Sequence, residues 1–130
     1  MSILFLSLIL VSCALTNPYH LTADTAGTVG LDVNSSGMAF CASFPVKVEV
    51  QRVVGGAAVK LGGFTHEASV GAGAYHWGRD ESGWFVERLS DDEGALLYPT
   101  PFDKCRAQSI AGLRTKSNRS SVVLWREVSP

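Results

Sequence analysis

The chain has 130 residues and a hydrophobic content of 46%, which suits one domain with a substantial core. Its net charge of −1 gives no electrostatic footprint for a nucleic-acid backbone or an anionic membrane surface, so we do not expect a nucleic-acid partner. Thirteen glycines and a charged fraction of 18% are typical of a turn-rich β-protein and disfavour a helical bundle.

The first residues predict an export signal. The apolar run from Ile3 to Val11 is much shorter than the ~20 residues that a membrane-spanning helix needs. Ser12 and Ala14 stand two positions apart, as at a signal-peptidase site. We therefore expect a signal peptide over residues 1–14, a secreted, extracellular mature chain and no transmembrane span.

The same stretch has a second interpretation. Leu10-Val11-Ser12-Cys13 resembles the lipobox of bacterial lipoproteins, in which the cysteine is lipidated and becomes the mature N-terminus. Lipoprotein signals nearly always carry Lys or Arg near their start, and Ser2 and Ile3 provide neither. A bacterial envelope lipoprotein lipidated on Cys13 is therefore kept as an alternative.

Residues 15–36 are small and polar, with several turn-forming residues. We expect a flexible N-terminal segment over residues 15–36, followed by a single β-rich domain over residues 37–130. Within the segment, the alternation of Val29, Leu31 and Val33 predicts a short edge strand.

The clearest periodicity lies in Phe44–Val54. Three valines at alternate positions fall on one side of an extended chain and polar residues fall on the other, which predicts a half-buried strand. The alternation slips at Arg52, where we expect a bulge or the end of the strand. Gly55-Gly56 then predicts a hairpin turn into a partner strand over residues 57–61.

Further strands are predicted where apolar residues alternate between turn signals, over residues 64–70, 74–78, 84–89, 95–98 and 122–128. The turns between them are assigned to Gly62-Gly63, Gly71–Gly73 and Asp91–Gly94. Asp103 as N-cap and Gly112 as stop predict one short helix near residues 103–111. The expected fold is mainly β, a small antiparallel β-sandwich or barrel with this helix and one disulfide.

Export leaves two cysteines, because Cys13 is either removed with the leader or lipidated. Two cysteines in an exported chain most simply pair, so we predict a Cys41–Cys105 disulfide. Closing a loop of this length contributes roughly 4 kcal/mol on the chain-entropy estimate. Neither cysteine has a second Cys or His at metal-ligand spacing, and we expect no metal and no other cofactor.

Two triplets match the N-glycosylation sequon. They begin at Asn34 and Asn118 and both lie in polar, turn-like surroundings that suit a glycan.

A catalytic alternative would use His66, Glu67, His76 and Arg79. Such groups serve as general base, general acid and phosphate clamp in metal-free ribonucleases. The residues do not reproduce the motif spacing of small secreted fungal ribonucleases. A secreted ribonuclease-like enzyme nevertheless remains an alternative function.

Aromatic residues suggest a binding patch. Tyr75, Trp77 and Trp84 gather around one expected hairpin, with Arg79 between them in sequence. If the core lies on the other face of the strands, these side chains form an exposed patch of the kind used to recognise a protein or a sugar.

The overall format is a short signal followed by a compact, glycine-rich body with two cysteines and no catalytic signature. This format resembles that of secreted effector-type proteins of fungi and other microbes, and the resemblance implies action on a host or competitor. We therefore predict a small, secreted, disulfide-stapled binding protein, effector-like or toxin-like, that recognises a protein or glycan. We expect a monomer that acts by binding rather than by catalysis.

Overall fold

Two antiparallel sheets and two short helices make up the part of the chain that the computed structural model describes, residues 16–67, 71–109 and 122–128. The smaller sheet has the order β1-β4-β5, from β1 (Tyr19–Ala23), β4 (Val46–Val54) and β5 (Ala57–His66). The larger sheet has the order β2-β3-β6-β7-β8, from β2 (Thr28–Asn34), β3 (Gly37–Ala42), β6 (Gly71–Asp80), β7 (Gly83–Arg88) and β8 (Val122–Arg126). The helices are α2 (Asp91–Leu97) and α3 (Pro99–Ser109).

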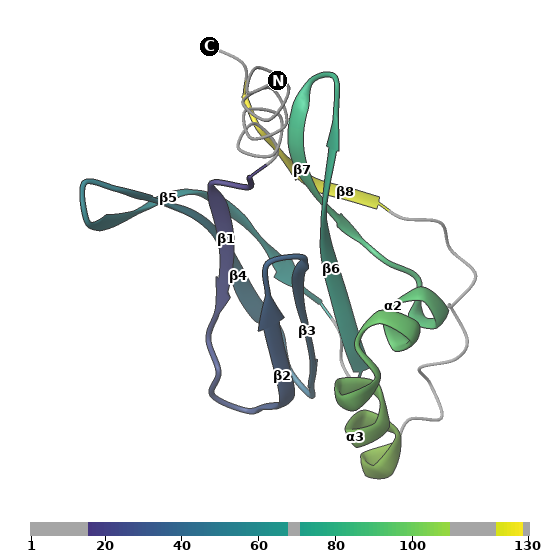
Figure 1. Cartoon of the computed structure of the whole chain (residues 1–130). Helices are drawn as coiled ribbons and strands as arrows, with labels where there is room; N and C mark the ends of the chain where they lie inside the picture. Colours follow the sequence, from purple (N-terminus) through teal and green to yellow (C-terminus); the bar gives the residue numbers. More distant parts are fainter. Residues whose placement is uncertain (1–15, 68–70, 110–121, 129–130) are drawn as a thin grey trace, which may run out of the picture.

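The sheets face each other and, within the described residues, do not close into a barrel (Figure 1). Both helices pack on the side of the larger sheet that faces away from the smaller one. The predicted fold, mainly β with an antiparallel sandwich, is confirmed. The predicted edge strand is also present, because β2 lies at one edge of the larger sheet.

The core between the sheets is built from alternate residues of facing strands. Val46, Val48 and Val50 of β4 are buried, as their alternation predicted. Met38 and Phe40 of β3 meet them from the larger sheet. Burial of one such side chain contributes roughly 1.5–3 kcal/mol, so this layer outweighs any ion pair on the surface.

A second core lies between the larger sheet and the helices. Ala39 of β3 and Ala74 of β6 face the rings of Tyr98 and Phe102. A Cβ atom at Gly94 would lie 2.7 Å from the Cβ of Ala74, so α2 can approach β6 this closely only with glycine there. Because one core lies on each side of it, β3 is buried along its whole length.

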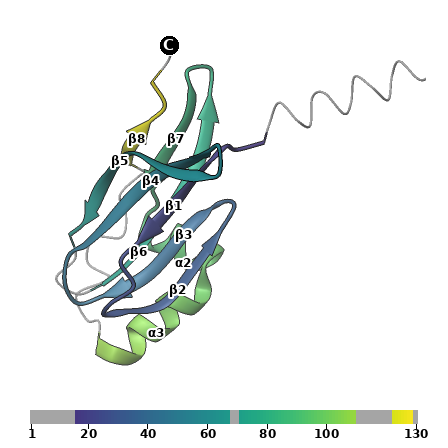
Figure 2. The same ribbon diagram turned by 90° about the vertical axis from the view of Figure 1, so that its left-hand side faces the viewer.

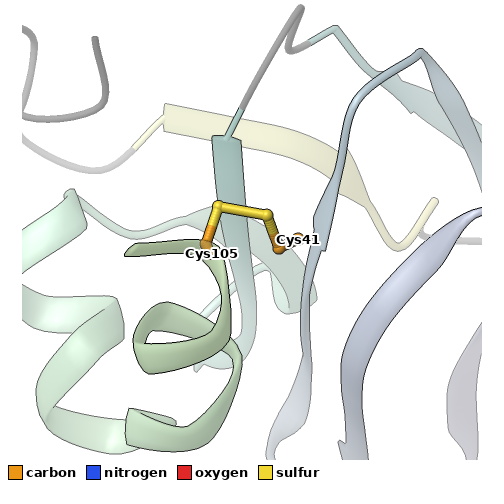
Figure 3. The surroundings of a disulfide bond; sticks show 2 residues. All are labelled: Cys41 and Cys105. Atoms are coloured by element: carbon orange, nitrogen blue, oxygen red, sulfur yellow. A yellow bond between two sulfur atoms is a disulfide. The ribbon is translucent and has the colours of Figure 1, made fainter. Parts of the chain in front are cut away.

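The predicted disulfide lies within this second core. Cys41 of β3 and Cys105 of α3 are bonded, with Cα atoms 5.5 Å apart (Figure 3). Both residues are buried. The bond therefore ties a central strand directly to the helical layer.

The expected flexible segment over residues 15–36 is corrected by the structure. It contains two strands, β1 and β2, and β1 pairs along β4 with Tyr19 opposite Arg52 and Leu21 opposite Val50. Tyr19 and Leu21 are buried in the core between the sheets, which explains why this segment is ordered. The predictions that concern residues 1–14, Cys13 among them, lie outside the described residues.

The helical layer also differs from expectation. The predicted helix begins at Pro99 rather than Asp103, because proline is well suited to the first turn of a helix. Asp91–Gly94, expected as a hairpin turn before a strand over residues 95–98, instead begins α2. The Ser90 side chain accepts from the Glu93 backbone N–H while the Glu93 carboxylate accepts from the Ser90 N–H, which is a capping box.

The central hairpin has the predicted turn, whereas the glycines after it do not form the turns that were predicted for them. Gly55 and Gly56 have φ of 59° and 83° and connect β4 to β5. The register of this pair shifts between Val50 and Gln51, next to the bulge that was expected at Arg52. Gly62-Gly63 and Gly71–Gly73, expected as turns, lie inside β5 and β6.

Removing the disulfide is expected to destabilise the domain. We predict that Cys41→Ala combined with Cys105→Ala lowers the free energy of unfolding by about 2–5 kcal/mol. The disulfide joins residues that are 64 positions apart, so its removal increases the conformational entropy of the unfolded chain. Urea unfolding of the oxidised wild type and of the double variant measures the difference. Reductant should lower the wild-type midpoint and leave the variant unchanged; equal midpoints without reductant would contradict the prediction.

Candidate binding site

Four aromatic rings gather where β1, β6, β7 and β8 meet, at one end of the core between the sheets. They belong to Tyr19, Trp77, Trp84 and Trp125. Tyr19 stacks on Trp77 with ring centroids 5.9 Å apart and meets Trp125 edge-on at 5.2 Å. Trp77 meets Trp84 and Trp125 edge-on at 6.5 and 5.8 Å. We call this cluster, together with Arg52, Arg79 and Glu127, the aromatic end.

The rings are exposed to different degrees. Tyr19 and Trp77 are buried, whereas Trp84 and Trp125 are half-buried. The first two therefore form a packed base, and the second two present part of their surface to solvent.

Two arginines lie over rings of the aromatic end. The Arg52 guanidinium is 5.8 Å from the centroid of Tyr19, and that of Arg79 is 5.3 Å from the centroid of Trp84. Strand register accounts for both contacts, because Arg52 pairs with Tyr19 and Arg79 pairs with Trp84. Such cation–π contacts hold exposed, charged side chains in defined positions.

A carboxylate completes the cluster. Glu127 accepts a hydrogen bond from the Tyr19 hydroxyl and a second from the Trp84 backbone N–H at 3.1 Å. The hydrogen bond from Tyr19 holds the pKa of Glu127 below its usual range, and the positive charges of Arg79 and Arg52 act in the same direction. Burial and the hydrogen bond to Glu127 raise the pKa of Tyr19.

This arrangement suits recognition. It offers partly exposed apolar ring surface, two guanidinium groups and one ionised carboxylate, each held by a named contact. Trp, Tyr and Arg are the side chains that contribute most to protein–protein binding.

The predicted exposed patch of Tyr75, Trp77, Trp84 and Arg79 is only partly correct. Tyr75 and Trp77 share a face as expected, but that face is the inner one, and their exposed fractions are 1% and 5%. Their role is packing. Trp84 and the exposed Arg79 are the members that a partner can reach.

The four residues of the ribonuclease alternative do not converge on one site. His66 is buried, hydrogen-bonded to the Tyr75 hydroxyl and edge-on to Phe40. His76 follows Tyr75 in β6, so it points to the opposite face of the sheet, where it lies 3.6 Å from Glu87. Glu67 is exposed next to His66. This arrangement does not support a shared phosphodiester site.

One candidate glycosylation site can be placed. Asn34 is exposed at the end of β2, and its Oδ1 accepts a hydrogen bond of 2.8 Å from the Ser36 backbone N–H. A hairpin turn of this kind is accessible to a glycan. Asn118 lies outside the described residues.

The sequence reasoning missed Tyr19, Arg52, Trp125 and Glu127 as site residues. Arg52 gave one signal, because it interrupts an apolar alternation. The other three lie at opposite ends of the chain, and only the pairing of β1, β7 and β8 with their neighbours brings them together.

His66 is expected to make stability depend on pH. Burial, with the positive charge of Arg88, lowers its pKa from 6.5 to about 4. Between these values the unfolded state binds more protons, so stability falls as the pH is lowered from about 6.5 towards 4, by up to roughly 3 kcal/mol. Urea unfolding across this pH range should show a decrease in the free energy of unfolding of the wild type and a much smaller decrease for His66→Gln.

His20→Gln is the matched control, because His20 is a half-buried strand histidine on β1. It should retain the wild-type pH dependence. Direct titration of the His66 ring by NMR provides a readout that does not depend on a stable variant. A midpoint near 6.5 would contradict the prediction.

Within residues 16–67, 71–109 and 122–128, no helix is long and apolar enough to cross a membrane. The same residues bring together no group of three or more His, Cys, Asp or Glu side chains that could hold a metal ion. Comparison of the chain with models of protein families, with curated proteins and with solved structures finds no match.

Proposed function

We propose that this chain is a small, exported, disulfide-stapled binding protein that recognises a protein partner through the aromatic end. The observation that carries the proposal is the pair of exposed arginines stacked on Tyr19 and Trp84 beside an ionised carboxylate. Action on a host or competitor, as an effector or toxin-like protein, is proposed from the resemblance in format alone.

A protein partner fits this geometry better than a glycan. Sugars bind aromatic residues by stacking on open ring faces, but here Arg79 lies over Trp84 and Arg52 lies over Tyr19. The groups left for a partner are the two guanidinium groups, a carboxylate and the exposed parts of the Trp84 and Trp125 rings. These groups match the charged and aromatic composition of protein interfaces.

Export is proposed from the leader and is supported by the buried disulfide, since such bonds persist in oxidising compartments. We expect the intact mass of the protein from its natural host to match Leu15–Pro130 and to rise by about two hydrogens on reduction. A loss of mass on deglycosylation would show that the chain carries an N-glycan, at Asn34 or Asn118. A diacylglyceryl group on Cys13 would instead establish the envelope lipoprotein and overturn secretion.

Arg79 is expected to contribute to partner binding. We predict that Arg79→Ala weakens the binding of the partner about tenfold or more, because it removes a held guanidinium and uncovers Trp84. The immobilised wild-type protein is used to capture binding proteins from an extracellular extract, and the captured proteins are identified. Their affinities for the wild type and for the variants are then measured by biolayer interferometry.

Arg126→Ala is the matched control. Arg126 is also exposed and stacked on a ring, 5.0 Å from the centroid of Phe85, but it lies on the other face of the larger sheet and pairs with Asp80. It should retain the wild-type affinity. Equal losses in both variants, or binding to an oligosaccharide panel and to no protein, would contradict recognition of a protein by the aromatic end.

A further inference from the structure

The hairpin of β4 and β5 extends beyond the rest of the smaller sheet in Figure 1 and points towards the viewer in Figure 2. We call residues 52–60 the arm; every one of them is exposed. β1 ends its pairing at Tyr19 opposite Arg52, so among the described residues no strand besides those of the hairpin pairs with the arm beyond that point. A Cβ atom at Gly55 or Gly56 would meet nothing within 4 Å. The arm therefore contributes little to packing.

The tip of the arm is apolar on both faces. Val53 pairs with Ala58 and Val54 pairs with Ala57, and successive residues of a strand point to opposite faces. Val53 and Val54 are each 55% exposed and Val59 is 41% exposed. A strand that is apolar on both faces is ordinarily surrounded by apolar material on both sides, and exposed apolar surface of this kind marks an interaction site.

Positive charge lies only at the base of the arm. Arg52 and Lys60 are at the two positions where the arm begins and ends, and residues 53–59 between them carry no charge. A ligand that matches the arm therefore has an apolar interior for the tip and negative charge at its surface for Arg52 and Lys60. A second copy of this chain does not provide it, because it would bring the same cations together.

A lipid bilayer with anionic headgroups has this layering, with hydrocarbon beneath a layer of phosphates. The acidic turn between β6 and β7 points in a different direction (Figure 1).

We infer that the arm docks on anionic lipid bilayers, with Val53, Val54 and Val59 below the headgroups and Arg52 and Lys60 at the level of the phosphates. Long basic side chains reach such a position readily. Arg52 also belongs to the aromatic end, so the residues that test the inference are Lys60 and the valines of the tip, which the aromatic end does not include. The inference predicts reversible binding, because one short apolar element gives a weak membrane anchor.

The test is sedimentation of the unlipidated, oxidised mature chain with vesicles of equal parts phosphatidylcholine and phosphatidylglycerol, and with vesicles of phosphatidylcholine alone. Val53→Glu combined with Val54→Glu should weaken partition to the mixed vesicles about tenfold or more, because it places charge on both faces of the inserted tip. Lys60→Gln should weaken it about fivefold on the mixed vesicles only.

Val33→Glu is the matched control, because Val33 is a similarly exposed valine, 49%, on the edge strand β2. It should partition as the wild type does, and near-ultraviolet circular dichroism should show that all variants are folded. No binding of the wild type to either vesicle, or equal binding by the Val53→Glu, Val54→Glu variant, would overturn the inference. Loss of a protein partner by that variant, without vesicle binding, would assign the arm to protein contact instead.

Discussion

The burial of β3 on both faces is the constraint on which the rest of the structure depends. Met38 and Phe40 point into the core between the sheets, while Ala39 and Cys41 point into the core beneath the helices. A strand in this position needs large side chains on one face and small ones on the other, because α2 and α3 lie close to it. The disulfide from Cys41 then fixes the distance between strand and helix, which hydrophobic packing alone would leave free to adjust.

Period-two alternation and a two-glycine turn made the central hairpin predictable. Both signals are local, and the structure reproduces them in β4, in the turn at Gly55 and Gly56 and in the buried valines. The disulfide was predictable for a different reason, since an exported chain with two cysteines has one pairing. The same local reasoning failed for the later glycines, where glycine is required by close packing. A Cβ atom at Gly63 would lie 2.4 Å from the Val48 carbonyl oxygen, and one at Gly73 would lie 2.5 Å from the His66 ring.

The helices and the aromatic residues show two further limits of the sequence. Ser90 and Glu93 have the spacing of a capping box, and acidic residues favour the first turn of a helix, so a local signal for α2 was present and was assigned to a turn. For Tyr75 and Trp77 no such local signal exists. Alternation shows that they share a face, but which face is inward depends on the smaller sheet, whose strands come from elsewhere in the chain. For the same reason the sequence did not predict that Tyr19 and Trp125 are neighbours, because their contact depends on strands that are distant in the chain.

The register shift after Val50 separates two roles of one strand. Up to Val50, β4 presents valines to the core and is covered on its inner face. Beyond the shift, Arg52 lies over Tyr19 at the end of that core, and the next residues leave the body of the protein as the arm. Arg52 therefore stands at the boundary of the core, the aromatic end and the arm. Because the buried half of β4 holds the strand in place, the exposed half can carry apolar residues that the core does not need. Their exposure agrees with the proposed docking on a bilayer, because exposed apolar surface is typical of interaction sites.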